Sequence, residues 1–198
     1  SAASDVYKRQ SNNIPIIGKT SGLAIAEGGD MFWLDNETLV IGKGYRTNQI
    51  GVEQIRRTLG PFKVEVISFD LPFFKGPTAC LHMMSLISVV DEKKALAYMP
   101  LLPIELVQLL KKKGYDLIEA PKNEFISSEG LNINVLAIKP GICVMISGCP
   151  RTKKALEKKG HKLIKRGGYI GEANGIMILE EGYFGGGDCR GETSAIGY

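Results

Sequence analysis

Short stretches of alternating apolar and polar residues recur along the chain, and each is followed by a segment with helical spacing. Residues 31–42 alternate on both sides of Asn36-Glu37, a pattern typical of a β-hairpin. Apolar residues then recur every three or four positions over residues 48–59, which predicts an amphipathic helix. A further apolar stretch at residues 64–69 predicts a returning strand. The first part of the chain is therefore expected to fold as two strands, a helix and a third strand.

The same order of elements recurs twice more. Helices are expected over residues 103–113 and 150–159, and the three helices end at Gly60, Gly114 and Gly160. A repeat of roughly 50 residues indicates modules that stack or surround an axis. Because strand and helix alternate throughout, the predicted class is α/β. The other strands are expected at residues 81–89, 95–99, 115–119, 134–138, 142–147 and 161–165.

Composition and charge narrow the class of protein. Hydrophobic residues make up 44% and charged residues 23% of the 198 residues, which is typical of a globular domain with its own core. The net charge of +4 comes mostly from lysine pairs on predicted helices, which favours a solvated surface over a nucleic-acid interface. No apolar run reaches the roughly 18 residues that a membrane span needs. We therefore expect neither nucleic acid nor a membrane as a partner.

The cysteines predict a reducing compartment. Cys80, Cys143, Cys149 and Cys189 show no CxxC pair and no zinc-like spacing, and no signal-peptide pattern precedes them. They are interpreted as reduced thiols of a cytoplasmic protein.

The first ten residues differ in character from the rest. Residues 1–10 are interpreted as a non-native tail, because Asp5 to Gln10 can be back-translated as a transposon end used in preparing DNA sequencing libraries. The alternative is a natural, flexible N-terminus. Residues 11–198 are expected to form one domain, in which the glycine-rich segment 185–187 belongs to the start of a fourth module.

Polar residues stand at the same point of three successive modules. They are Glu27, His82 and Asn132, and they would converge if the modules surround an axis. A carboxylate bonded to an imidazole fixes the tautomer of the histidine, which is the usual preparation for general acid–base catalysis. The alternative is that His82 is a core histidine with satisfied hydrogen bonds. His161, the other histidine, follows a basic helix and is expected at the surface.

Two residues of the first module are candidates for ligand binding. Asp30 follows a Gly-Gly pair, which lets the backbone approach a ligand, so its carboxylate could bind a cation. Turn formation by the aspartate side chain is an equal alternative. Arg46 precedes a predicted helix start and could hold an anion there; the alternative is a plain surface arginine.

Cys189 is the candidate nucleophile. It follows the glycines of segment 185–187, in a polar and glycine-rich surrounding that the other cysteines lack. An imidazole such as that of His82 would activate this thiol as a thiolate. No phosphate-binding motif accompanies the glycines, so the segment by itself does not indicate a nucleotide.

Three of these motifs together resemble those of the guanidine-modifying superfamily of arginine deiminases, amidinotransferases and dimethylarginine dimethylaminohydrolases. They are Glu27-Gly-Gly-Asp30, Arg46-Thr-Asn-Gln49 and Cys80-Leu-His-Met-Met-Ser85. The resemblance covers residues 14–190 and implies a propeller of five ββαβ modules, of which the first is missing here. Met84 stands where deiminases usually carry an aspartate, so the histidine motif is more similar to the dimethylaminohydrolase branch.

The resemblance also implies an activity. His82 would be the general acid and base with Glu27 as its partner, Arg46 would hold the substrate α-carboxylate, and Asp30 would lie near the substrate. Cys189 would attack the guanidinium carbon, and water would hydrolyse the resulting thiouronium. The implied reaction is hydrolysis of a C–N bond in an arginine-like small molecule, with no metal and no organic cofactor. A homodimer is left open.

Two alternatives remain at this point. An amidinotransferase would use an amine in place of water as the second nucleophile. A non-catalytic guanidine-binding remnant would follow if Gly191 occupies the nucleophile position. The family motif resembles Gly-Gly-x-x-Cys-x-Thr, so alignment on Thr193 favours Gly191, whereas distance from the glycines favours Cys189.

Overall fold

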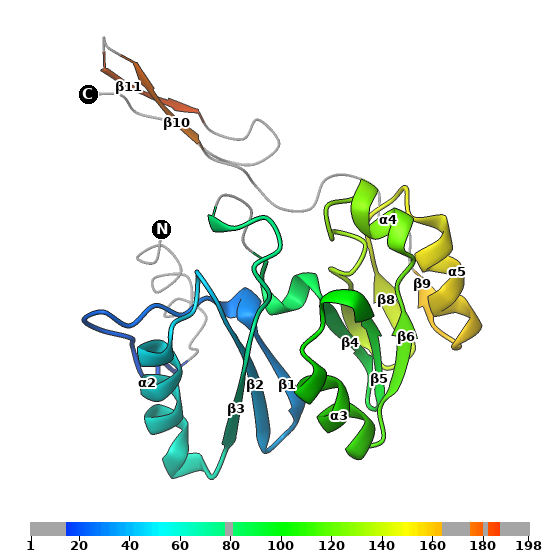
Figure 1. Cartoon of the computed structure of the whole chain (residues 1–198), viewed down its shortest axis with the longest axis horizontal. Helices are drawn as coiled ribbons and strands as arrows, with labels where there is room; N and C mark the ends of the chain where they lie inside the picture. Colours follow the sequence, from blue (N-terminus) through cyan, green and yellow to red (C-terminus); the bar gives the residue numbers. More distant parts are fainter. Residues whose placement is uncertain (1–14, 78–80, 164–174, 180–181, 187–198) are drawn as a thin grey trace. The chain divides into compact units, whose positions relative to one another are not determined.

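The computed structural model describes residues 15–77, 81–163, 175–179 and 182–186 (Figure 1). The interpretation of residues 1–10 as a non-native tail falls outside these ranges and stays a prediction. No helix in the described ranges is long and apolar enough to cross a membrane.

The chain divides into two compact units, residues 1–164 and 165–198. In the second unit the structure describes an antiparallel pair of strands, β10 (Gly175–Leu179) and β11 (Gly182–Gly186). This pair is consistent with the start of a fourth module. The prediction of one domain over residues 11–198 stays a prediction.

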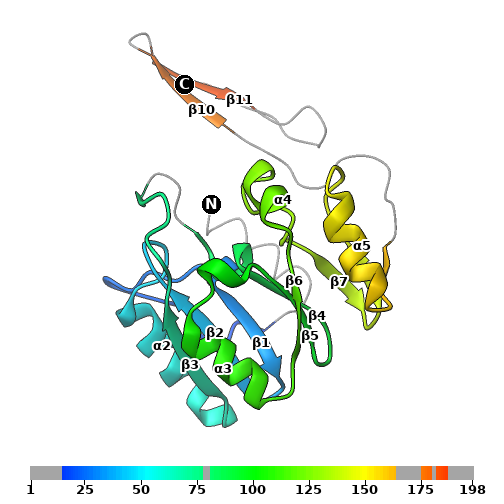
Figure 2. The same ribbon diagram turned by 45° about the vertical axis from the view of Figure 1, so that its right-hand side comes forward.

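The first unit contains three modules of the predicted order. In each, two antiparallel strands are followed by a helix and by a third strand that pairs in parallel with the second. Figures 1 and 2 show the modules following one another, the first in blue and cyan, the second in green and the third in yellow. The mixed α/β class is confirmed.

The bounds of the elements agree with the predicted ranges to within a few residues at most ends. The first module has β1 (Met31–Asp35), β2 (Thr38–Lys43), α2 (Gln49–Leu59) and β3 (Glu65–Asp70). The second has β4 (Ile87–Asp91), β5 (Lys94–Ala97), α3 (Ile104–Lys112) and β6 (Asp116–Glu119). The third has β7 (Leu136–Lys139), β8 (Ile142–Val144), α5 (Pro150–Lys158) and β9 (Lys162–Leu163). Short helical segments lie between them: η1 (Gly28–Asp30), η2 (Gly60–Phe62), η4 (Met83–Ser85), η5 (Met99–Leu101) and α4 (Lys122–Ser127).

Two segments differ from the sequence-based expectation. The strand expected over residues 81–89 begins only at Ile87, because η4 precedes it. In η4 the carbonyl of His82 accepts from the Ser85 N–H, which closes a turn instead of joining a sheet. Helix α4 was not predicted; the side chain of Glu124 in α4 accepts hydrogen bonds from the first turn of α5. The Met83 N–H of η4 also donates to the side chain of Asp30, so both segments make tertiary hydrogen bonds.

Strand β2 is buried on both faces. Leu39 and Ile41 pack with Val52 of α2 in a cluster confined to the first module. Val40, on the opposite face, joins the largest cluster of the first unit, which also contains Leu96 of the second module and Leu156 of the third. Burying one such side chain contributes about 1.5–3 kcal/mol. The modules are therefore joined through a shared apolar core.

His161 corrects the sequence-based expectation of a surface histidine. Its side chain is buried, with 3% of the residue exposed, and its Nδ1 lies 3.7 Å from Sγ of Cys143. Among the described residues, the Nε2 atom has no hydrogen-bond partner. Burial lowers the pKa of His161, with nearby Asp91 opposing the effect and Lys94 adding to it. The same burial raises the pKa of the Cys143 thiol, so this cysteine is held in the unreactive thiol form.

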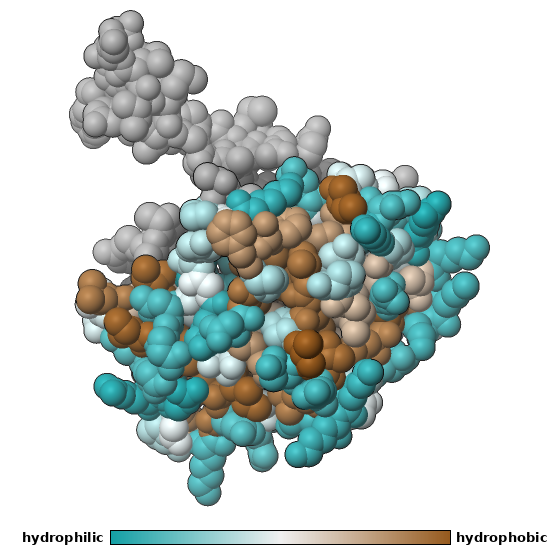
Figure 3. Space-filling model, viewed as in Figure 1, coloured by the Kyte–Doolittle hydropathy of each residue, from teal (hydrophilic) through white to brown (hydrophobic). Residues whose placement is uncertain are grey.

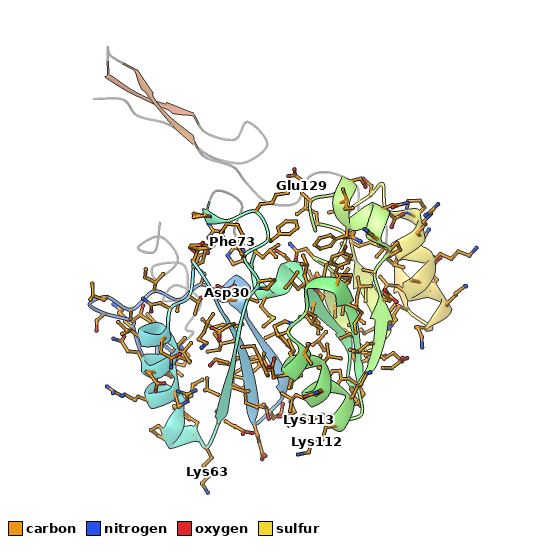
Figure 4. All side chains as sticks on the ribbon, viewed as in Figure 1. Asp30, Lys63, Phe73, Lys112, Lys113 and Glu129 are labelled. Atoms are coloured by element: carbon orange, nitrogen blue, oxygen red, sulfur yellow. The ribbon has the colours of Figure 1, made fainter. Side chains whose placement is uncertain are left out.

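Lys113 links the second module to the hairpin of the first. Its Nζ donates to Asp35 Oδ2 at 2.8 Å and to Thr38 Oγ1 at 3.0 Å. The hydrogen bond from Lys113 is the largest cause that lowers the pKa of Asp35 from 3.8 to about 2. Figure 4 shows Lys113 and Lys112 near the lower edge of the drawing, well below Asp30. On the face seen in Figure 3, hydrophilic side chains project around smaller hydrophobic patches, as expected for lysines on solvated helices.

Replacing Lys113 by methionine should destabilise the first unit by about 1 kcal/mol at neutral pH, because Asp35 loses its charged partner. The charged form of Asp35 is favoured in the folded state, so this stabilisation is present above about pH 4 and is lost as pH falls towards 2. Urea unfolding of K113M and wild type at pH 7 and near pH 2 measures both effects. The exposed neighbour gives the control K112M, which should match wild type; an equal loss in both variants would contradict the role of the Lys113–Asp35 pair.

Candidate functional site

Glu27 lies on a loop that is fixed against the start of α2. The side chain of Asn48 accepts from the Gly51 N–H, which caps the helix, and also from the Ile25 N–H at 3.2 Å. A side chain at Gly51 could not be accommodated, since its Cβ would lie 2.2 Å from the Ile25 carbonyl oxygen. The Glu27 N–H donates to Thr47 Oγ1 at 3.1 Å. The helix start therefore determines where the carboxylate of Glu27 can reach.

His82 directly precedes η4 and points to this carboxylate. Its Nε2 lies 2.8 Å from Glu27 Oε2, and its side chain is 23% exposed. A carboxylate at this distance accepts a hydrogen bond from the ring, so the proton is placed on Nε2. The predicted carboxylate–imidazole pair is therefore present, although 55 residues separate its members.

Arg46 completes the cluster. Its Nε lies 3.3 Å from Glu27 Oε1, and its Nη1 lies 3.2 Å from His82 Nε2. A ring nitrogen that carries a proton can donate a hydrogen bond but cannot accept one. Nε2 therefore cannot donate to Glu27 and also accept from Arg46. The carboxylate is therefore the shared partner, with one oxygen facing the imidazole and the other facing the guanidinium.

Asp30 lies beneath these three side chains and is fully buried. Its Oδ2 accepts from Thr47 Oγ1 at 2.7 Å, and its Oδ1 accepts from the Met83 N–H at 3.0 Å. The sequence suggested either cation binding or turn chemistry for this residue. The described contacts use one lone pair on each oxygen within the protein, and substrate contact by Asp30 stays a prediction.

Gly29 lets the loop approach the imidazole. A Cβ atom at this position would lie 2.9 Å from Cδ2 and 3.0 Å from Cγ of His82, closer than real side chains pack. At Gly28, by contrast, an added Cβ would have no neighbour within 4 Å. A side chain would fit at Gly28. At Gly29 it would overlap the His82 ring, so glycine is required there for the Glu27–His82 contact.

A hollow of about 490 Å³ lies beside the cluster. Tyr45 and Thr47, on either side of Arg46, line it, and so does Leu81, which precedes His82. Phe73 also lines it, and Figure 4 labels Phe73 just above Asp30. Aromatic and aliphatic walls next to a polar cluster are typical of small-molecule sites.

Other predicted residues are not brought to this cluster. Asn132 is buried in the third module, where its Nδ2 donates to Thr152 Oγ1 at 3.1 Å, and it does not join Glu27 and His82 as the repeat suggested. Cys189 and Gly191 lie outside the described residues. Within the described ranges, no group of three or more His, Cys, Asp or Glu side chains is gathered so that it could hold a metal ion. Thr47 was not singled out from the sequence, and only its place in the Arg46-Thr-Asn-Gln49 motif hinted at a role.

Comparison with known proteins agrees with these motifs. The family model "Arginine deiminase" matches residues 10–102. The uncharacterized protein YkgA of Bacillus subtilis (strain 168) is 26% identical over 139 residues, which are 70% of this chain and 44% of that protein. The chain thus spans less than half the length of this relative.

Solved structures share the fold. A mutant of dimethylarginine dimethylaminohydrolase from Pseudomonas aeruginosa, in complex with citrulline, matches with a TM-score of 0.57 and 21% identity, over 73% of this chain and 49% of that one. The N-terminal domain of ArgZ, an arginine dihydrolase from cyanobacteria bound to its product, matches with a TM-score of 0.65 and 17% identity, over 81% of this chain and 56% of that one.

The family model covers less than half of the chain, and it agrees with the resemblance of the motifs to the guanidine-modifying superfamily. The relatives named by these matches, apart from the uncharacterized protein, are enzymes that act on guanidine compounds.

Replacing Gly29 by alanine should move the imidazole of His82 away from Glu27, because the added methyl group overlaps the ring. Side-chain ¹⁵N NMR detects this change directly, since the chain has only two histidines. The matched variant Gly28→Ala adds the same methyl group where there is space and should leave the His82 signals unchanged. Equal spectra for both variants would show that Gly29 does not set the position of the ring.

Proposed function

We propose that this chain is part of a hydrolase that cleaves a guanidinium C–N bond in arginine-like substrates, in the manner of dimethylarginine dimethylaminohydrolases. The proposal rests on the cluster of Glu27, His82 and Arg46 and on the match of residues 10–102 to the arginine deiminase family model. Since the chain spans only part of the length of its relatives, the activity is proposed for the whole protein.

One observation carries the proposal: the carboxylate of Glu27 already faces a guanidinium group beside His82. That group is the side chain of Arg46, which lies within 3.3 Å of both partners. A carboxylate facing a guanidinium forms a charge-assisted hydrogen bond of the kind that recognises such ligands. A substrate guanidinium would displace Arg46 and place its carbon next to the imidazole.

In the proposed reaction the Cys189 thiolate attacks the guanidinium carbon and forms a C–S bond. The C–N bond to the departing amine then breaks, and His82, made an imidazolium by the proton of the Cys189 thiol, gives its Nε2 proton to that nitrogen. His82 next takes a proton from water, whose oxygen attacks the thiouronium carbon. The C–S bond breaks, the thiolate is restored, and a ureido product leaves. The proton on Nε2 points to Glu27 at rest, which keeps it beside the place where the leaving nitrogen would lie.

The remaining parts of the substrate require their own partners. Once displaced from Glu27, Arg46 could bind an α-carboxylate bidentately. The neighbouring hollow, lined by Tyr45, Leu81 and Phe73, offers room for the aliphatic part of an arginine-like molecule.

We also propose that the modules are blades of a propeller. Two findings support this arrangement: the starts of the first two modules meet at Glu27 and His82, and all three modules contribute to one core. The shared fold with a dimethylaminohydrolase and an arginine dihydrolase agrees with it.

Mass spectrometry after incubation with a chloroacetamidine reagent tests the proposal. This reagent mimics a guanidinium and alkylates activated thiols, so we expect one adduct on Cys189 that an arginine analogue suppresses. His82→Ala should abolish the adduct, and Glu27→Gln should slow its formation at least about tenfold, because the imidazole loses the partner that orients it.

Glu53→Gln is the matched control for Glu27→Gln. Both carboxylates are 42% exposed and both pair with an arginine, but Glu53 lies on α2 and pairs with Arg56. Labelling in the Glu53 variant should equal that of wild type. Equal labelling of Cys80, Cys143 and Cys189 would argue against an activated nucleophile, and retained guanidine binding without any adduct would identify a non-catalytic guanidine-binding protein instead.

Arg46→Ala separates the two roles of this arginine. Because the Arg46 side chain competes with a ligand for Glu27, its removal should strengthen binding of methylguanidine, which has no carboxylate. It should weaken binding of arginine several-fold, because the clamp for the α-carboxylate is lost. Calorimetric titration of both ligands measures the two affinities. Parallel changes for the two ligands would contradict one of the roles.

A further inference from the structure

The buried carboxylate of Asp30 reaches all three residues of the candidate site through their neighbours in the chain. It accepts from Met83, which follows His82, and from Thr47, which follows Arg46. Thr47 in turn accepts from the N–H of Glu27. Three segments that are far apart in the sequence are therefore tied to one carboxylate.

We infer that Asp30 and Thr47 are the positioning residues of this site, which hold Glu27, Arg46 and His82 in register without touching the substrate. The inference deepens the proposed function and rests on it, since it concerns the same site.

The direction of each hydrogen bond supports this assignment. The Thr47 hydroxyl accepts the Glu27 N–H at 3.1 Å and donates its own proton to Asp30 at 2.7 Å. The single hydroxyl of Thr47 thus binds the backbone of Glu27 and the side chain of Asp30 at the same time. The Asp30 N–H donates to the Glu27 carbonyl at 3.0 Å, which fixes the same loop from its other end.

Burial makes these bonds hard to replace by water. Asp30, Thr47 and Met83 are each 0% exposed. A buried polar group that loses its partner carries the full desolvation cost, so each bond strongly disfavours movement of the segment that makes it. The side chains above them are by contrast 23–43% exposed and open to a ligand.

A second hydroxyl–carboxylate pair in the same chain provides the control. In the third module, Thr152 Oγ1 donates to Glu124 Oε2 at 2.6 Å and accepts from Asn132 Nδ2 at 3.1 Å. Thr152 is also 0% exposed. It matches Thr47 in burial and bonding but shares no described contact with the candidate site.

The experiment compares Thr47→Val, Thr47→Ser and Thr152→Val in the full chain. Valine keeps the shape of threonine but lacks the hydroxyl, whereas serine keeps the hydroxyl. Side-chain ¹⁵N NMR reports on His82, with the buried His161 as an internal reference, and calorimetry measures the affinity for methylguanidine. Thermal unfolding measures stability in each variant.

If the inference is correct, Thr47→Val shifts the His82 signals, leaves those of His161 in place and weakens methylguanidine binding at least about fivefold. Thr47→Ser restores both towards wild type. Thr152→Val loses a comparable amount of stability but leaves His82 and the affinity unchanged. If Thr47→Val loses stability and nonetheless keeps the His82 signals and the affinity of wild type, the inference is overturned.

Asp30→Asn provides a second variant should Thr47→Val fail to fold. An amide can accept from Met83 or from Thr47, but its NH₂ group cannot accept, so one of the two bonds is lost. The same shift of the His82 signals is expected, and an unchanged spectrum overturns the inference. Wild type that binds no methylguanidine, together with shifted His82 signals in Asp30→Asn or Thr47→Val, would refute the proposed function while supporting the positioning role.

Discussion

Each module of this protein has too few strands to bury its own apolar residues, and the rest of the first unit follows from that constraint. Strand β2 is apolar on both faces, so α2 can cover only one of them. The other face, with Val40, needs the neighbouring module, and the largest cluster accordingly combines Val40 with Leu96 and Leu156. Burial of apolar surface therefore brings equivalent parts of successive modules together.

The candidate site is a consequence of that packing. The shared core places the segment before β1 next to the segment before β4, and these segments carry Glu27 and His82. Where the two segments meet, the backbone groups need partners, and the carboxylate of Asp30 and the hydroxyl of Thr47 supply them. The site thus consists of buried, hydrogen-bonded polar groups and of partly exposed charged side chains that face solvent.

The two histidines show how the same side chain takes opposite roles. His82 faces a carboxylate and an arginine, and its side chain is 23% exposed. His161 is enclosed beside Cys143, and burial lowers its pKa. Sequence neighbours alone pointed the other way, because His82 stands between Leu81 and Met83 whereas His161 follows a basic helix. Only the repeat, with Glu27 at the equivalent point, distinguished His82.

The sequence by itself determined the order of strands and helices, since apolar periodicity, caps and glycines act over a few residues. It also predicted the pairing of Glu27 with His82. The tertiary structure decided what depends on contacts between distant segments. These are the turn of η4 in place of a strand, the burial of His161, the hydrogen bond from Asn132 to Thr152, and the contacts of Asp30 with Thr47 and Met83. Such features depend on which polar groups are removed from water when the modules pack. The spacing of residues along the sequence does not predict this.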